Sequence, residues 1–414
     1  MNKKTIRDVS LKGKRVLMRV DFNVPVKDGV IGDSTRITAA LPTIRYVLEQ
    51  GGSLVLMSHL GRPKGKGYEA EFSLKPVAEH LAKVLGRPVV FAPDCLAADG
   101  AVKAMKPGDV VMLENTRFYK EEEASVKKTD DLSEEEYKAK KAALKEKQQV
   151  MAQKLATYGD LYCNDAFGSA HRAHASTAVV CKFFKDNVAG FLMEKEIDYL
   201  SRVLEAPEHP CVALLGGAKV SDKVNVITNL LTKVDALIIG GAMAYTFYRA
   251  KGLPTGKSLV EEDKVDLAKA ILQKAQASGK KLLLPVDHLI AESTGAKSAE
   301  TVGEAGIKDG TMALDIGPQS IKLFAAEIVK AKTVVWNGPM GYFENPVFAA
   351  GTVAIAKAIA ATKCLSIVGG GDSVSAVNQS GLADKMTHIS TGGGASLEFL
   401  EGKILPGVAA LTNK

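Results

Sequence analysis

Short apolar runs alternate with helix-period segments along most of the chain. The first half carries five such runs, at Arg15–Val20, Ser53–Met57, Val89–Phe91, Val110–Leu113 and Leu161–Asn164. The second half carries six more, at Cys211–Leu215, Ala236–Ile239, Lys281–Leu284, Thr333–Trp336, Cys364–Val368 and Thr387–Ser390. All are rich in Val, Leu and Ile without strict alternation, which is typical of strands buried on both faces. The pattern predicts α/β architecture, and because eleven strands are too many for one comfortable sheet, we expect two parallel sheets in two lobes.

The segments between these runs have helical periodicity, as in Leu74–Leu85, Val265–Ala277 and Gln319–Ala331. A lobe boundary is expected near residue 190. There the sequence Asn187–Gly190 predicts a turn, and Glu194–Leu204 predicts a helix that connects the lobes.

Residues 120–150 are dense in charges of both signs. Ser133 and Glu136 have the spacing of a capping box, which marks the start of a helix. A thin apolar stripe follows, formed by Tyr137, Leu144, Met151 and Leu155. The segment therefore predicts a surface helix inserted before the strand at Leu161. A solvated face is the favoured interpretation, and a partner-binding surface is the alternative.

Basic residues follow the strands of the first half. In an open parallel sheet, ligands bind beyond the carboxyl ends of the strands. Four arginines and three histidines lie in the segments that follow those ends: Arg36, Arg62, Arg117, Arg172, His59, His171 and His174. Since guanidinium groups bind phosphate and carboxylate in a bidentate way, the arginines predict a site for a small, highly anionic ligand. A metal or catalytic cluster of the histidines is the alternative, although their spacing does not match the usual zinc patterns.

Glycine-rich loops follow five strands of the second half. They are Gly216–Lys219, Gly240–Ala242, Asn337–Gly341, Gly369–Asp372 and Thr391–Gly394. Glycine allows backbone N–H groups to approach phosphate closely, so this repetition predicts a nucleotide site. Asp372 is the candidate ligand of a nucleotide-bound Mg²⁺, and Lys219 is the candidate partner of a migrating phosphoryl group.

Composition narrows the possible partners and compartment. The net charge of +7 suits an anionic substrate, whereas the aromatic content of 6% and the lack of a basic tract interleaved with aromatics disfavour nucleic acid. No apolar run approaches the roughly 20 residues that span a bilayer, and no apolar region follows the basic N-terminus. Five scattered cysteines favour neither disulfides nor a thiolate metal site. We expect a cytoplasmic protein that binds no membrane.

Seven blocks of this sequence resemble the phosphoglycerate kinase family, in order and across nearly the whole chain. They are Arg19–Pro25, Ser58–Pro63, Asn164–Gly168 with His171–His174, Gly216–Lys223, Asn337–Gly341, Gly369–Ser373 and Thr391–Glu398. The resemblance implies two Rossmann-like, doubly wound parallel-sheet lobes joined by a hinge helix. It implies a phosphoglycerate-binding lobe over residues 1–188 and a nucleotide-binding lobe over 189–396 that begins with the connecting helix. Residues 397–414 would return to the first lobe.

The resemblance also implies the reaction. A phosphoryl group would pass reversibly from 1,3-bisphosphoglycerate to ADP, giving 3-phosphoglycerate and ATP, by direct in-line transfer with hinge closure and with Mg²⁺. A monomer is implied as well. Two rivals stay open at this stage: an NAD dehydrogenase, which the missing Gly-x-Gly-x-x-Gly fingerprint disfavours, and a nucleotide-gated binding module.

Carried over position by position, the resemblance assigns roles to individual residues. Phosphoglycerate would be bound by Asp21, Phe22, Asn23, Arg36, His59, Leu60, Gly61, Arg62, Arg117 and Arg172. The nucleotide would be bound by Gly216, Gly217, Lys219, Lys223, Gly241, Asn337, Pro339, Glu344, Gly370, Gly371, Asp372 and Ser373. Catalysis would involve Arg36, Lys219, Gly393 and Gly394, with Asp372 on the metal. Ala242 and Ala313 stand where the family frequently has glycine near the adenine, which leaves the fit of the base open.

Overall fold

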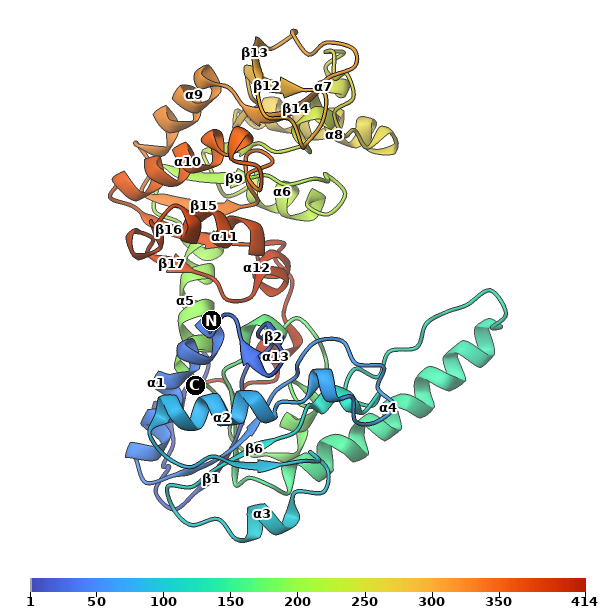
Figure 1. The fold of residues 1–414 in the computed structure, drawn as a ribbon, viewed down its shortest axis with the longest axis vertical. Coiled ribbons are helices and arrows are strands. Elements are labelled where there is room, and N and C mark those ends of the chain that lie inside the picture. Colours follow the sequence, from blue (N-terminus) through green and yellow to red (C-terminus); the bar gives the residue numbers. More distant parts are fainter. Residues whose placement is uncertain (1) are drawn as a thin grey trace. The chain divides into compact units, whose positions relative to one another are not determined.

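The computed structural model describes residues 2–414, and the chain divides into two compact units (Figure 1). The first unit contains the chain up to Asp198 together with Ile404–Lys414, and the second contains Tyr199–Lys403. The division falls inside the helix α5 (Phe191–Glu205).

The first unit is built on a six-stranded parallel sheet in the order β5-β6-β4-β1-β7-β8. The strands are β1 (Arg15–Arg19), β4 (Ser53–Met57), β5 (Val90–Ala92), β6 (Val110–Leu113), β7 (Leu161–Asn164) and β8 (Asn187–Ala189). Helices α1 (Thr35–Glu49) and α2 (Lys75–Leu85) cover one face. Helices α3 (Asp99–Lys103) and α4 (Glu134–Ala156) cover the other. Val16 and Met18 of β1 pack with α1 and α2, whereas Leu17 packs on the opposite face, so the central strand is buried on both sides.

Smaller elements complete the first unit. They are the hairpin of β2 (Val26–Lys27) and β3 (Val30–Ile31), the helix α13 (Pro406–Ala409), and short 3-10 turns that include η3 (Thr116–Phe118) and η5 (Val179–Phe183).

The second unit contains another six-stranded parallel sheet, in the order β11-β10-β9-β15-β16-β17. Its strands are β9 (Cys211–Leu215), β10 (Ala236–Ile239), β11 (Lys281–Leu283), β15 (Thr333–Asn337), β16 (Leu365–Gly369) and β17 (His388–Ile389). Its helices are α6 (Val224–Leu230), α7 (Ala244–Ala250), α8 (Val265–Ala277), α9 (Pro318–Ile328), α10 (Ala350–Ala361), α11 (Gly371–Gln379) and α12 (Gly393–Leu400). Phe324 of α9 and Ile355 of α10 pack on one face of the sheet. The fold is thus the doubly wound one predicted from sequence.

All eleven predicted strands are confirmed, but two features differ from the sequence interpretation. Asn187–Ala189 forms the strand β8 rather than a turn. Its parallel pairing with β7 and the hydrogen bond from the Asn187 side chain to the Cys181 carbonyl, 3.0 Å long, stabilise it. The second unit also contains a small antiparallel sheet of β13 (Glu300–Gly303), β12 (Asp287–Ala291) and β14 (Met312–Ile316) that the sequence analysis missed. Its strands carry Asp, His, Glu and Gly, which mask the apolar signal.

The inserted helix α4 extends away from the sheet of the first unit (Figure 1). Its predicted capping box is present, since the Glu136 N–H donates to the Ser133 hydroxyl and the Ser133 N–H donates to the Glu136 carboxylate. Only its C-terminal half is anchored: Met151 and Leu155 are buried against the sheet, whereas the Leu144 side chain is half-buried. No helix in residues 2–414 has the length and apolarity that crossing a bilayer requires.

We predict that α4 stabilises the first unit mainly through its C-terminal half. Leu155→Ala removes a fully buried side chain, so the free energy of unfolding should fall by about 2–5 kcal/mol. Leu144→Ala on the projecting half is the matched control and should cost about 0.5 kcal/mol or less. Urea unfolding followed by circular dichroism measures both. Equal costs would show that α4 is anchored along its whole length.

Candidate active site

Strand register gathers the basic residues of the first unit. Arg19 at the end of β1 lies opposite Met57 of β4 and Asn164 of β7, so the segments that follow these three strands emerge at one edge of the sheet. Arg36, in the first turn of α1, reaches this edge and pairs with Asp21, with 3.1 Å between Nη1 and Oδ1.

Backbone and side-chain hydrogen bonds join the loops after β1, β4 and β6. The Gly61 N–H donates to the Asn23 side-chain oxygen at 2.9 Å, and Arg117 Nη1 donates to the Gly61 carbonyl at 2.9 Å. Gly61 has a φ of +61°, and a Cβ there would lie 2.4 Å from the Phe72 ring, so glycine is required. The side chains of Phe22 and Leu60 are buried in the core, which leaves only their backbone to face a ligand.

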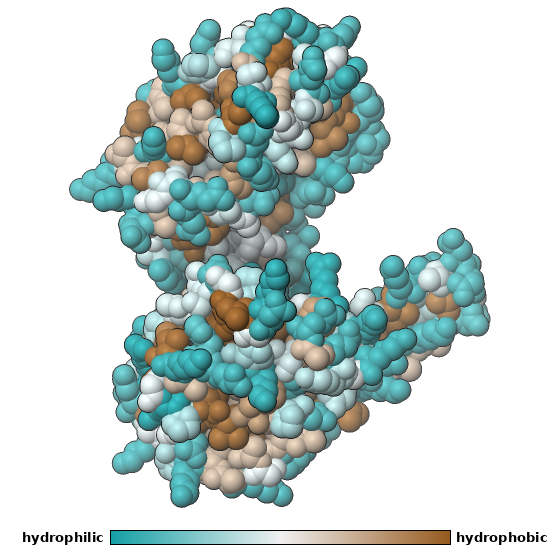
Figure 2. All heavy atoms as spheres, viewed as in Figure 1, coloured by the Kyte–Doolittle hydropathy of each residue, from teal (hydrophilic) through white to brown (hydrophobic). Residues whose placement is uncertain are grey.

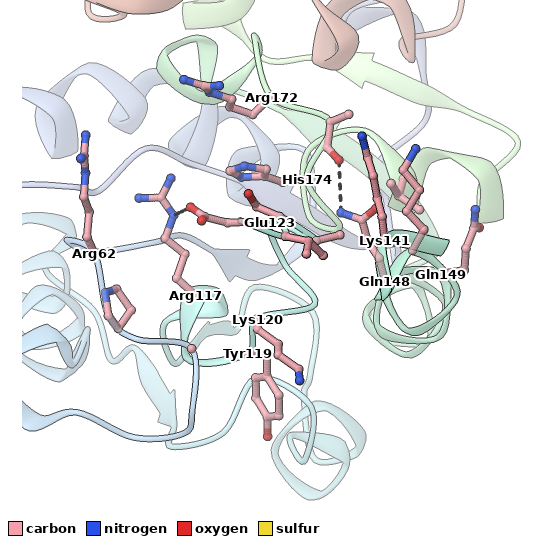
Figure 3. Close-up of a pocket in the computed structure, with 18 of the residues that line it drawn as sticks. Arg62, Arg117, Tyr119, Lys120, Glu123, Lys141, Gln148, Gln149, Arg172 and His174 are labelled. Atoms are coloured by element: carbon pink, nitrogen blue, oxygen red, sulfur yellow. Dashed lines mark hydrogen bonds and ion pairs between the residues drawn. The ribbon is translucent and has the colours of Figure 1, made fainter. Parts of the chain in front are cut away.

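Three of the four predicted arginines line one hollow of about 860 Å³ (Figure 3). Arg62, Arg117 and Arg172 contribute to its wall together with His174. Glu123 pairs with Arg117, with 2.8 Å between Oε1 and Nε. The structure therefore brings these arginines together as predicted, while Arg36 engages Asp21 instead.

Arg19 is a residue of this edge that the sequence analysis did not single out. It is fully buried, and its Nη2 lies 3.0 Å from His59 Nδ1. Its Nε donates to the Ser176 hydroxyl at 2.8 Å, and Ser176 in turn donates from its backbone N–H to the buried carboxylate of Glu122 at 3.0 Å. A buried charge is stable only when it is paired and hydrogen-bonded, which this network provides. The available signal was an arginine directly after the apolar residues Val16–Met18 of the strand, two residues before Asp21.

Two histidines near this edge, His59 and His174, are held neutral at pH 7 by burial. Burial, followed by the nearby charges of Arg19 and Arg117, lowers the pKa of His59 well below its usual value. Burial lowers the pKa of His174 to about 3. Neutral imidazoles can orient a ligand by hydrogen bonding, and they leave the positive charge of the edge to the arginines.

In the second unit, the loops after β9, β10 and β15 pack backbone against backbone. A Cβ on Gly216 would lie 2.0 Å from the Pro339 carbonyl oxygen, and one on Gly241 would lie 2.5 Å from the Gly217 nitrogen. The N–H groups of Gly216, Gly217 and Gly241 already donate to carbonyls, at 2.9, 3.1 and 2.9 Å respectively. Close packing therefore explains Gly216 and Gly241, and a φ of +99° explains Gly217. A nucleotide would meet the Cα atoms of these glycines rather than their N–H groups.

In the second unit, backbone N–H groups without an acceptor lie at the starts of α11 and α12. Gly371, Asp372 and Ser373 open α11, and Gly393 and Gly394 open α12. Their N–H groups donate to no acceptor within residues 2–414, as expected for the first turn of a helix. The two starts adjoin, because a Cβ on Gly393 would lie 3.4 Å from the Gly370 Cα. Adjacent helix N-termini favour a polyanion.

Charged residues flank these helix starts. Burial lowers the pKa of Lys223, whereas the carboxylates of Asp222 and Asp372 act in the opposite direction. The Ser373 hydroxyl accepts a hydrogen bond from the Gly338 N–H at 2.5 Å, and the Asn337 side chain lies beside Gly370. Lys219, Glu344 and Asp372 are exposed. Within residues 2–414, no group of three or more His, Cys, Asp or Glu side chains is arranged to hold a metal.

Two doubly wound units, one with an arginine-lined hollow and one with adjoining helix N-termini, are the features of a kinase for a small anionic substrate. Comparison with known proteins specifies which one. The family model "Phosphoglycerate kinase" matches residues 6–403. Proteins named phosphoglycerate kinase from Clostridium perfringens and Chloroherpeton thalassium are each 53% identical, over 417 and 419 residues. These alignments cover 100% of this chain in both cases, and 99% and 100% of the relatives.

Solved structures agree with the sequence matches. Phosphoglycerate kinase from Coxiella burnetii is 40% identical with a TM-score of 0.87, and that from Pyrococcus horikoshii is 34% identical with a TM-score of 0.82. Both comparisons cover 99% of this chain and 98% of the other. The chain belongs to the phosphoglycerate kinase family. It is a glycolytic phosphotransferase with a carboxyl group as acceptor, and the comparisons favour neither the dehydrogenase nor the binding module.

We predict that the rings of His59 and His174 do not titrate between pH 5.5 and 8. Because the folded-state pKa of His174 is about 3 and its ordinary value is 6.5, the unfolded chain binds more protons between these values. His174 therefore does not lower the free energy of unfolding above pH 6.5. As the pH falls from 6.5 toward 3, it lowers that free energy progressively, because the unfolded chain binds the extra proton. Imidazole NMR titration measures the ring, and His174→Gln should flatten the decline in unfolding free energy below pH 6.5. A ring that titrates near pH 6.5 would contradict this assignment.

Proposed function

We propose that the first unit binds phosphoglycerate at its arginine-lined edge and that the second binds ADP or ATP at the starts of α11 and α12. The reaction of the family moves a phosphoryl group from 1,3-bisphosphoglycerate to ADP and yields 3-phosphoglycerate and ATP. The observation that carries the proposal is the convergence of Arg62, Arg117 and Arg172 on one hollow. Planar guanidinium groups suit the phosphate and carboxylate of a three-carbon acid.

The remaining residues at the sheet edge of the first unit are proposed to orient the acid. We assign Asp21 and Asn23 to its hydroxyl and carboxyl groups, and neutral His59 to a hydrogen bond. Arg36 is proposed to exchange its partner Asp21 for the transferring phosphoryl group. Phe22, Leu60 and Gly61 would contribute through the backbone.

The nucleotide phosphates are assigned to the N–H groups of Gly371 to Ser373, with Gly393 and Gly394 beside the transferring group. Lys219 and Lys223 would supply positive charge, and Asn337, Pro339 and Glu344 would border the nucleoside. Gly216, Gly217 and Gly241 are proposed to let the nucleotide approach the backbone closely. Supporting this assignment, the adjoining α11 and α12 N-termini offer unused N–H donors.

A Mg²⁺ ion that accompanies the nucleotide fits this edge. Mg²⁺ is usually held by one or two carboxylates together with substrate phosphates and water, so one exposed protein carboxylate is enough. Asp372, in the first turn of α11, is the proposed ligand. The ion would neutralise phosphate charge when bound.

The chemistry proposed is direct in-line transfer without a covalent enzyme intermediate. Phosphoryl transfer depends mainly on positioning and charge neutralisation. The carboxylate that leaves the acyl phosphate needs no proton at neutral pH, so no general acid is required. The proposal includes hinge closure, which would exclude water from the reactive acyl phosphate.

We further propose that the protein acts as a cytoplasmic monomer. The five cysteines are free thiols, which suits a reducing compartment. Size-exclusion chromatography with light scattering measures the oligomeric state.

Arg62→Ala should weaken 3-phosphoglycerate binding and leave ADP binding almost unchanged. The substitution removes one charge-assisted contact, worth about 1.5–3 kcal/mol, and it does so only in the unit proposed to bind phosphoglycerate. Arg45→Ala, which removes an exposed arginine of α1 outside the hollow, is the matched control. Isothermal titration measures both ligands. Equal weakening of both would refute the division of labour between the units.

Lys219→Ala should lower kcat by about 10²–10³-fold, as does removal of one donor to a transition-state charge elsewhere. The Lys219 side chain is exposed, so the fold should persist without it. Lys269→Ala on the exposed surface of α8 is the control. Steady-state assay of ATP formation measures the effect, and near-normal turnover would remove Lys219 from the proposed machinery.

A further inference from the structure

The arginine-lined hollow extends beyond the residues assigned to phosphoglycerate. Five lysines also line its wall: Lys64, which is close in sequence to Arg62, and four others, which are Lys120 after η3, Lys182 of η5, and Lys141 and Lys145 of α4. We call Lys120, Lys141, Lys145 and Lys182 the lysine annex. All four line the same hollow as Arg117 and Arg172, and Figure 3 shows Lys141 on one side of it, with Lys120 extending beside Tyr119. The annex therefore converges from three separate segments of the first unit.

The annex lysines are not neutralised by the protein. None of the four forms an ion pair with a carboxylate in residues 2–414, although other lysines of α4 do. Lys138 lies 3.8 Å from Glu134, and Lys154 lies 2.7 Å from Asp99. Lys141 lies 5.7 Å from the ring centre of Tyr137, a contact that adds no negative charge.

The carboxylates of the region are used elsewhere. Glu123 is the one acidic side chain in the wall of the hollow, against eight lysines and arginines, and it pairs with Arg117. Glu134 to Glu136 occupy the first turn of α4, where their negative charges interact favourably with the helix dipole. They do not line the hollow. No carboxylate in the wall of the hollow therefore pairs with the annex.

The helix tolerates an unfavourable arrangement to present these lysines. Lys141 and Lys145 are spaced i,i+4, so they face each other on one side of α4, and like charges at this spacing destabilise a helix by a few tenths of a kcal/mol. Figure 2 shows that the projecting end of the first unit is covered largely by hydrophilic side chains. A bound anion would turn this repulsion into attraction at both lysines.

The hollow has room for a ligand larger than phosphoglycerate. Its volume of about 860 Å³ lies in the upper part of the roughly 300–1,000 Å³ range of ligand pockets. A three-carbon phosphate ester at the arginines would leave the annex unfilled. A linear ligand with charges spaced along it would contact both groups of basic residues.

We propose that the lysine annex is a binding site for a free inorganic oligophosphate, a chain of at least three linked phosphates. The oligophosphate lies along Lys141 and Lys145 of α4 and reaches Arg172. Since Arg172 is also assigned to phosphoglycerate, the two ligands compete. This competition rests on the proposed function, whereas oligophosphate binding itself does not.

Titration of the full chain with inorganic tripolyphosphate, without Mg²⁺, tests the binding site. The double substitution Lys141→Gln with Lys145→Gln should weaken tripolyphosphate binding about tenfold or more, because two charges at contact distance are lost. The matched control is Lys140→Gln with Lys147→Gln. It removes the same charge from the same exposed helix, at positions outside the hollow, and should weaken binding less than about threefold.

The outcomes separate the site from a general charge effect. Equal weakening by the two double substitutions, unchanged binding in the Lys141/Lys145 variant, or no binding by the original chain would each overturn the proposal. Circular dichroism confirms that α4 is intact in both variants.

Steady-state kinetics then tests the competition. Tripolyphosphate should raise the KM for 3-phosphoglycerate in the original chain and do so about tenfold less effectively in the Lys141/Lys145 variant. Without tripolyphosphate, that variant should keep kcat and KM within about twofold, because the arginines are unchanged. Inhibition that leaves KM unchanged would overturn the shared use of Arg172. Failure of the proposed function would appear separately, as normal 3-phosphoglycerate binding in Arg62→Ala.

Discussion

Parallel pairing of short, doubly buried strands is the constraint on which both units depend. Strands such as β4 and β9 carry almost no polar side chains, so they are stable only between two helical layers. Because the neighbouring strands run in the same direction and in register, the polar segments after them emerge at one edge. Site residues that are dispersed over more than a hundred residues of sequence are thereby collected in each unit, where hydrogen bonds such as those of Gly61 with Asn23 and Arg117 then join them.

Much of this arrangement could be predicted from the sequence, since apolar runs bounded by glycine and polar residues mark buried strands well. The residues that escaped prediction have a common physical cause. Asn187 lies in a strand that is defined by pairing with β7 rather than by its own composition. Arg19 is stabilised by Ser176 and Glu122, which lie far from it in the sequence, and no local pattern reports such a network. At both positions, contacts with residues distant in the sequence determine the structure.

The glycine-rich loops show how one composition can serve two physical purposes. The sequence suggested a single purpose, the approach of N–H groups to phosphate. In the structure, Gly216 and Gly241 are required because neighbouring backbones touch there, and their N–H groups are already bonded. Gly371 and Gly393 instead lie at helix starts with unused donors. Sequence alone cannot separate these cases, because the acceptor of an N–H group is determined by the packing of other loops.

The way α4 is attached has a consequence for how this protein can change over evolutionary time. Gln148 donates to the carbonyls of Glu122 and Ala173, at 3.0 and 3.2 Å, and Met151 and Leu155 pack on the sheet. Everything N-terminal to this anchor projects without a core of its own. Substitutions, insertions or shortening in the outer turns therefore carry little thermodynamic penalty, so the surface beside the arginines can diversify without loss of the sheet that positions them.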